Sequence, residues 1–252
     1  MKSFCMFVAG LFLAVSMAAC AYVGASPEYP SAKIRYKMTV EVETPEGIKA
    51  GAAVREISMR SRPMLMGESN DTRVDLEKGE AVVVDLGPRG VLFSTLGAAG
   101  EAAWTFMNAF PSPCAEGKVS RCSIKYYRSL GVGTKAELAV RYYPFFVTFG
   151  DLKDHKSAKR LLEMKSCPDP ETGIPDNSRC VEKDHFEALF GQGVRLKSVM
   201  VEVTQEPISS LVDKWIPWLE TPARVPQSLG AVTKNPFTNV MDPRISPGSL
   251  KK

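Results

Sequence analysis

Residues 33–43 alternate strictly between polar and apolar side chains. The apolar positions are Ile34, Tyr36, Met38, Val40 and Val42. This pattern predicts a long strand with one buried face. A turn signal at 45–47 is followed by a second apolar stretch at 48–59, so the two strands are expected to form a hairpin. Gly51, Ala52 and Ala53 interrupt the second strand and indicate a bulge or a site of close packing.

The rest of the chain to residue 220 mixes short strands with short helices. Strands are predicted at 72–77, 80–86, 91–95, 145–149 and 194–203, and helices at 100–110, 183–190 and 208–219. Residues 123–141 fit either a helix or irregular structure. Because strands and helices do not alternate regularly, we expect an α+β fold with a mainly antiparallel sheet, forming one domain over residues 33–220.

The first twenty residues have the features of an export signal. Lys2 is their only charge, and the apolar stretch after it is shorter than the roughly 20 residues of a membrane-spanning helix. We therefore predict a signal peptide at 1–19. Met17, Ala18, Ala19 and Cys20 resemble the lipobox of bacterial lipoproteins, which implies cleavage before Cys20 and a diacylglycerol on its sulfur. The alternative is ordinary secretion with cleavage after Ala25.

Two segments flank the predicted domain. Residues 20–32 hold Gly24, Pro27 and Pro30 and are expected to form a tether that reaches roughly 40 Å when extended. Residues 221–252 contain five prolines and no sustained apolar period, which predicts a disordered or surface-lying tail. By resemblance to enteric lipoproteins, Ala21 after the lipidated cysteine favours the outer membrane over the inner one.

The net charge of the 252-residue chain is +4, from 32 basic and 28 acidic residues. The tail at 221–252 carries five basic residues and one acidic residue, so residues 20–220 sum to −1. A folded part without a basic surplus argues against a nucleic-acid partner. The basic tail is instead expected to make weak, salt-sensitive contacts with anionic envelope surfaces.

Four cysteines remain beyond Cys5 and Cys20, and an even number in an exported chain predicts two disulfides. Three pairings are open. We favour Cys114–Cys122 and Cys167–Cys180, because each pair brackets a segment rich in Pro, Gly, Ser and charge. The second pair would then close a loop insertion at 167–180. The two cysteines of each pair are separated by 7 and 12 intervening residues, a spacing that fits a four-cysteine zinc site poorly.

Other candidate chemistry is sparse. His155 and His185 each follow an aspartate in charged surroundings and are expected at the solvated surface. No catalytic residue, metal ligand or cofactor is assigned from the sequence. Trp215, Pro217 and Trp218 form a candidate contact patch, since tryptophan combines apolar area with a hydrogen-bond donor. The same residues could instead cap the sheet.

Three strings, TVEVETPEG at 39–47, VTFGD at 147–151 and FGQGVRLK at 190–197, resemble those of a group of uncharacterised proteobacterial exported proteins. The resemblance covers residues 33–220 and implies a Gram-negative source and no particular activity. We therefore expect a lipid-anchored, periplasm-facing envelope protein that contacts membrane lipid through Cys20. It is expected to act as a non-catalytic interaction or structural module, with an envelope protein as its candidate partner. The alternative is a periplasmic hydrolase or small-ligand-binding protein.

Overall fold

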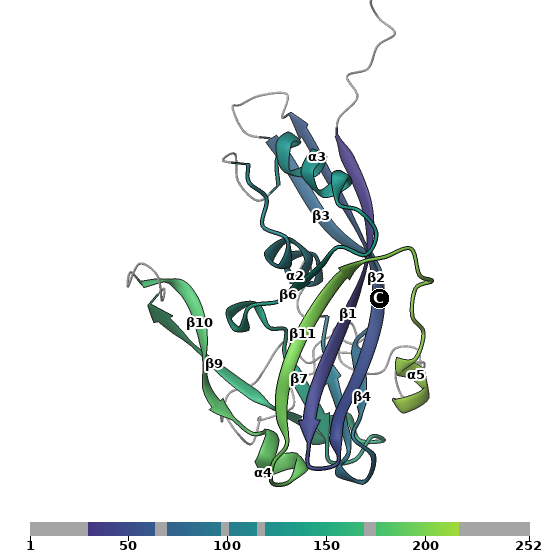
Figure 1. Ribbon diagram of the computed structural model, residues 1–252, viewed down its shortest axis with the longest axis vertical. Helices are drawn as coiled ribbons and strands as arrows, with labels where there is room; N and C mark the ends of the chain where they lie inside the picture. Colours follow the sequence, from purple (N-terminus) through teal and green to yellow (C-terminus); the bar gives the residue numbers. More distant parts are fainter. Residues whose placement is uncertain (1–29, 64–69, 97–100, 115–118, 169–174, 217–252) are drawn as a thin grey trace, which may run out of the picture. The chain divides into compact units, whose positions relative to one another are not determined.

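The computed structural model describes residues 30–63, 70–96, 101–114, 119–168 and 175–216. Of the two compact units of the chain, Met1–Pro30 and Ser31–Lys252, the second contains nearly all of these residues. It has an α+β fold with three antiparallel sheets (Figure 1). The largest has the order β3-β2-β1-β11-β6, with β1 at Ser31–Thr44, β2 at Gly47–Pro63, β3 at Asn70–Lys78, β6 at Lys135–Glu137 and β11 at Arg195–Val203.

The first two strands form the predicted hairpin. Thr44 pairs with Gly47 at the turn, and the register continues without a shift to Ser31 opposite Arg60. Gly47 has φ +117°, a conformation that side chains other than glycine's rarely tolerate. The even-numbered residues of β1 are buried along its whole length, as the alternating sequence predicts.

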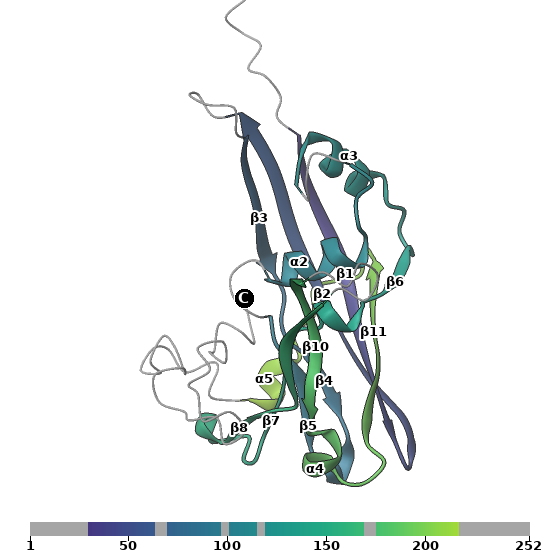
Figure 2. The ribbon, with the colours of Figure 1, turned by 90° about the vertical axis from the view of Figure 1, so that its left-hand side faces the viewer.

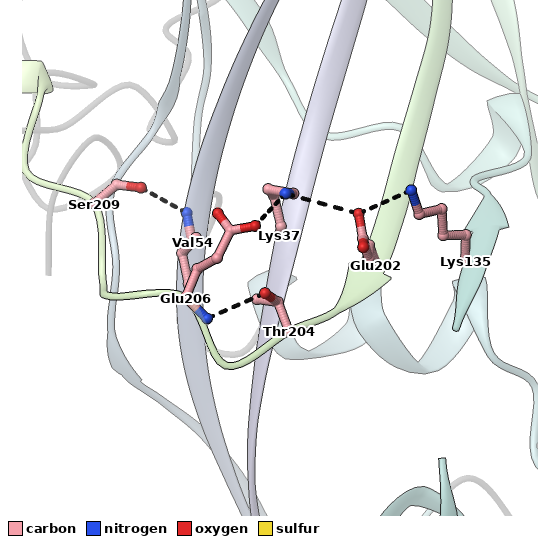
Figure 3. Close-up of polar contacts among 7 residues, drawn as sticks. All are labelled: Lys37, Val54, Lys135, Glu202, Thr204, Glu206 and Ser209. Carbon is pink, nitrogen blue, oxygen red and sulfur yellow. Dashed lines mark hydrogen bonds and ion pairs between the residues drawn. The ribbon is translucent and has the colours of Figure 1, made fainter. Parts of the chain in front are cut away.

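The other face of this sheet is polar and is crossed by ion pairs between neighbouring strands. Glu202 on β11 lies 3.8 Å from Lys37 on β1 and 3.3 Å from Lys135 on β6 (Figure 3). Further along the strands, Glu41 pairs with Lys197 at 3.0 Å and Glu43 with Arg195 at 2.9 Å. Opposite charges across adjacent strands favour this register over a shifted one.

The buried face packs against two helices, α2 at Glu101–Ala109 and α3 at Arg121–Ser129. Phe106 of α2 is at the centre of this core. Its ring centroid lies 5.5 Å from that of Tyr36 on β1, 5.1 Å from Phe110 and 5.6 Å from Tyr127 on α3. The Tyr36 hydroxyl donates a hydrogen bond of 2.7 Å to the carbonyl of Ala102, which satisfies a fully buried phenol.

The four-stranded sheet is buried on both faces. It consists of β4 at Val82–Asp85, β5 at Val91–Ser94, β7 at Phe146–Phe149 and β8 at Ala158–Arg160. Leu92 and Phe146 belong to the main core, whereas Phe93 and Val147 belong to a second core beneath α5 at Val212–Trp215. Burial on both faces explains why β7 comes from an apolar run in which Thr148 is the only polar residue, and the Thr148 hydroxyl donates to the carbonyl of Val91 at 2.8 Å.

Residues 204–211 connect β11 to α5 along the polar side of β2. The Val54 amide donates to the Ser209 hydroxyl at 2.8 Å, and Glu206 pairs with Lys37 (Figure 3). The predicted helix at 208–219 is therefore reduced, within the described residues, to the four of α5. The Ser209 hydroxyl accepts a hydrogen bond from the Val54 amide of β2. The main-chain N–H groups of Leu211 and Val212 donate to the Glu80 carboxylate.

The third sheet differs from expectation. β9 at Leu162–Pro168 and β10 at Pro175–Asp184 form an antiparallel pair, so much of the stretch expected as a loop insertion at 167–180 is strand. The short helix α4 at Phe186–Phe190 follows, as predicted for 183–190. Within the described residues, three single-turn 3-10 helices, η1 at Gly87–Arg89, η2 at Val140–Tyr142 and η3 at His155–Ser157, complete the domain.

Candidate functional site

A groove of about 560 Å³ lies where α2, α3 and η2 meet. Its apolar walls come from the end of α2 and from the aromatic residues of α3 and η2. Its charged groups, Glu137 and Arg141, come from β6 and η2. The residues that line the groove include Met107, Pro111, Tyr127, Glu137, Arg141 and Tyr142.

One rim of the groove is fixed covalently. Cys114, which lines the groove, is bonded to Cys122 in the first turn of α3, with 5.9 Å between their Cα atoms. This confirms one of the two predicted disulfides. The same helix end is held by a capping box, in which the Ser120 side chain accepts from the Ser123 amide and the Ser123 side chain from the Ser120 amide. The disulfide thus ties α3 to the segment after α2, and the capping box fixes where α3 begins.

The groove can bind both apolar and charged groups. The Arg141 guanidinium lies 5.3 Å from the ring centroid of Tyr142, so it presents a cation over an aromatic face. Burial, and then the neighbouring Tyr126, raises the pKa of Tyr127 to about 12, so its hydroxyl stays protonated near neutral pH. Met107 and Pro111 supply adaptable and rigid apolar surface respectively.

A second cavity of about 330 Å³ lies on the other side of η2 and shares Ala139 and Arg141 with the groove. Arg179 of β10 and both remaining thiols also line it. Cys180 is opposite Lys165 in the β9–β10 register, so Cys167, two residues beyond Lys165, is diagonal to Cys180 on the same face.

The predicted Cys167–Cys180 disulfide is wrong for this structure. Both residues carry free thiols. The physical reason is their diagonal position. Diagonal partners on paired strands are about 7–8 Å apart, farther than the Cα separation that a disulfide usually spans.

The two histidines have different surroundings. His185 Nε2 lies 3.0 Å from Glu163 Oε1, and only 16% of the His185 side chain is exposed, so the expectation of a solvated residue is wrong for His185. Burial of Glu163 opposes its ionisation, but hydrogen bonds from His185 and Lys183 outweigh this effect and lower its pKa. The side chain of His155 lies outside the described residues. The Glu163–His185 pair lines neither cavity described above.

The candidate contact patch at the C-terminal side is only partly within the described residues. Trp215 packs against the second core, where Val212 and Ile216 are fully buried beneath it. Trp215 therefore contributes to the cover over the four-stranded sheet. Pro217 and Trp218 lie outside the described residues, as do Cys20 and most of the predicted tether and tail.

Comparisons with protein-family models, with curated proteins and with solved structures give no match for this chain. No helix among the described residues is long and apolar enough to cross a membrane. Over the same residues, no group of three or more His, Cys, Asp or Glu side chains is placed to hold a metal ion.

The residues of the groove escape prediction from the sequence. They come from α2 and the residues after it, from α3, from β6 and from η2. The stretch at 123–141 gives no clear period because a helix, a turn and a three-residue strand follow one another within it. The local signal that does exist is the pair Arg141-Tyr142, since Arg and aromatic residues are both enriched at binding surfaces.

Proposed function

We propose that this chain is an exported, lipid-anchored envelope protein whose domain binds a partner protein through the groove between α2, α3 and η2. The observation that carries the proposal is the disulfide-braced rim beside a cluster of Tyr, Met and Arg side chains. Tyr, Met and Arg are enriched at the centres of protein interfaces. A structural disulfide is typical of proteins that fold in an oxidising compartment, which supports export.

The groove is tested by site-specific photo-crosslinking in cells. A photoreactive amino acid replaces Tyr142 in one variant and Ile48 in a control variant. Ile48 is 55% exposed, near the β1–β2 turn, and lines neither cavity. We expect a discrete cross-linked species from position 142 that weakens when Arg141→Ala is added. Equal cross-linking from both positions would count against the groove.

A small ligand is the second candidate, because the groove volume of about 560 Å³ falls within the range of small-molecule sites. Native mass spectrometry of protein purified from the envelope separates the two. A bound molecule of constant mass that is lost in the Tyr142→Ala variant would favour the ligand over the protein partner.

The proposed anchor is tested at the mature N-terminus. Mass spectrometry is expected to find a chain that begins at Cys20 and carries acyl groups, and Cys20→Ser is expected to release the protein from the membrane fraction. An unmodified chain beginning at Ser26 would instead support ordinary secretion.

A further inference from the structure

The exposed face of α3 carries a row of three basic residues. Arg121, Lys125 and Arg128 are all exposed and follow a spacing of four and three residues, which places them on one side of the helix. The opposite side, with Ser123, Ile124 and Tyr127, is buried. The helix contains no acidic residue, and within the described residues none of the three basic side chains forms an ion pair. The charge sum of −1 over residues 20–220 does not reveal this row.

The basic row continues onto the start of β1. A cavity of about 370 Å³ is lined by Arg128, Lys33, Arg35 and Val132, among others. Arg35 is paired with Glu56 at 2.8 Å, whereas Lys33 is exposed and has no partner among the described residues. Val132 is 64% exposed, the largest exposed fraction of any bulky apolar residue in the described part of the chain. Figures 1 and 2 both show α3 beside the beginning of β1.

Local helix energetics account for Arg128, which lies in the last turn of α3, but not for Arg121. Arg121 is the first residue of α3, and no acid occupies the first turn, although the positive end of the helix dipole favours acids there. The capping box and the disulfide offset this cost. A locally unfavourable arrangement that is braced in this way is typical of a functional surface.

Together these features lead us to infer that the surface formed by Lys33, Arg121, Lys125, Arg128 and Val132, here termed the basic surface, binds the anionic phospholipid headgroups of a membrane. The choice of a membrane rests on the proposed lipid anchor. Residues 21–30 separate Cys20 from Ser31, the first residue of β1, and this length limits the reach from anchor to domain to roughly 40 Å. An anchored domain can therefore bring the beginning of β1 to the bilayer surface. Positive charge and an exposed apolar side chain both complement that surface.

The test uses the mature full-length chain with Cys20→Ser, so that no acyl chain contributes. Flotation with vesicles of phosphatidylcholine alone and of phosphatidylcholine with 30% phosphatidylglycerol measures partitioning. The test variant combines R121Q, K125Q and R128Q. A matched control combines K49Q, K153Q and K156Q, which remove the same charge from exposed positions elsewhere. A third variant carries R224Q, R244Q and K251Q in the tail.

We expect binding to the anionic vesicles only, loss of this binding at 0.5 M salt, and a decrease of about 100-fold in the test variant, since each basic residue near an anionic surface contributes about five-fold. The matched control should bind like the parent. The melting temperature of the test variant should not fall, because its three side chains are exposed. If the melting temperature of the test variant does fall, a variant with R121K and R128K is used instead. It keeps the positive charge and should bind the anionic vesicles as strongly as the parent.

Several outcomes would overturn the inference. These are equal binding to neutral vesicles, equal losses in the test variant and the matched control, and loss in the tail variant alone. Binding of a fluorescent DNA duplex that depends on the basic surface, without vesicle binding, would assign it to nucleic acid instead. Because the chain in this assay carries no lipid, its result is independent of the mass spectrometry that tests the anchor.

Discussion

Arg55 and Glu80 are both buried, yet their charged groups do not bind each other. The Arg55 Nε donates to the main-chain oxygen of Glu80 at 3.0 Å, and the guanidinium also reaches the carbonyl of Ser94 at 3.4 Å. The Glu80 carboxylate accepts from the amides of Leu211 at 2.7 Å and Val212 at 3.0 Å. Glu80 therefore links β2, through its main-chain oxygen and Arg55, to the segment that places α5 over the second core.

Replacing Glu80 by glutamine should destabilise the domain. The amide that replaces the carboxylate has a single acceptor oxygen and no charge, while the two buried N–H groups remain. We expect a loss of about 1–3 kcal/mol in the free energy of unfolding, measured by urea denaturation. Glu182→Gln is the matched control, because Glu182 is exposed on β10, and should change stability by less than about 0.5 kcal/mol. Equal effects would remove Glu80 from this role.

Gly51→Ala should also destabilise the domain. A Cβ atom at position 51 would overlap the main-chain oxygen of Val83, because β2 and β4 approach each other closely there. Moving two strands apart should cost at least about 1–3 kcal/mol. The melting temperature of Gly51→Ala is compared with that of Ala52→Ser. Ala52 is the next residue of β2, and its side chain is exposed. A melting temperature as high as that of the control would contradict the close packing.

Removing the Cys114–Cys122 bond by a double replacement with serine should lower stability by about 2–3 kcal/mol, since it frees a short loop in the unfolded chain. The corresponding replacement of Cys167 and Cys180 should have little effect. Alkylation of the Cys20→Ser mature chain before reduction, followed by mass spectrometry, should label two thiols. Labelling of none would restore the second predicted disulfide.

The contacts of Glu163 with His185 and Lys183 should make the free energy of unfolding depend on pH. The pKa of Glu163 is lowered from 4.5 in the folded protein, so its ionised form contributes stability that is fully present above pH 4.5 and is lost as the pH falls through the folded value. Urea denaturation between pH 7 and pH 3 should show that the difference in stability between the parent and Glu163→Gln shrinks as the pH falls below 4.5. A difference that stays constant to pH 3 would exclude this contribution.

Strong local patterns in the sequence predicted much of the fold. The alternation at 33–43, the turn at 45–47, the helix ended by Pro111 and the apolar run at 145–149 all reappear near the expected bounds. Even Gly51 was informative, because a small residue inside a strand indicates close approach. Predictions failed where several weak segments combine, as at β9–β10, whose pairing depends on contacts with the rest of the domain.

The sequence by itself determined the antiparallel α+β class and the β1–β2 hairpin, and it favoured the pairing of Cys114 with Cys122. Each follows from residues close together in the chain, whose side chains select among few local conformations. Only the tertiary structure decided which distant residues meet. It placed Arg141 beside the α2–α3 groove, turned Trp215 toward a core and separated charge onto one face of α3. Total charge and composition are sums over residues, and a sum does not record which residues share a surface.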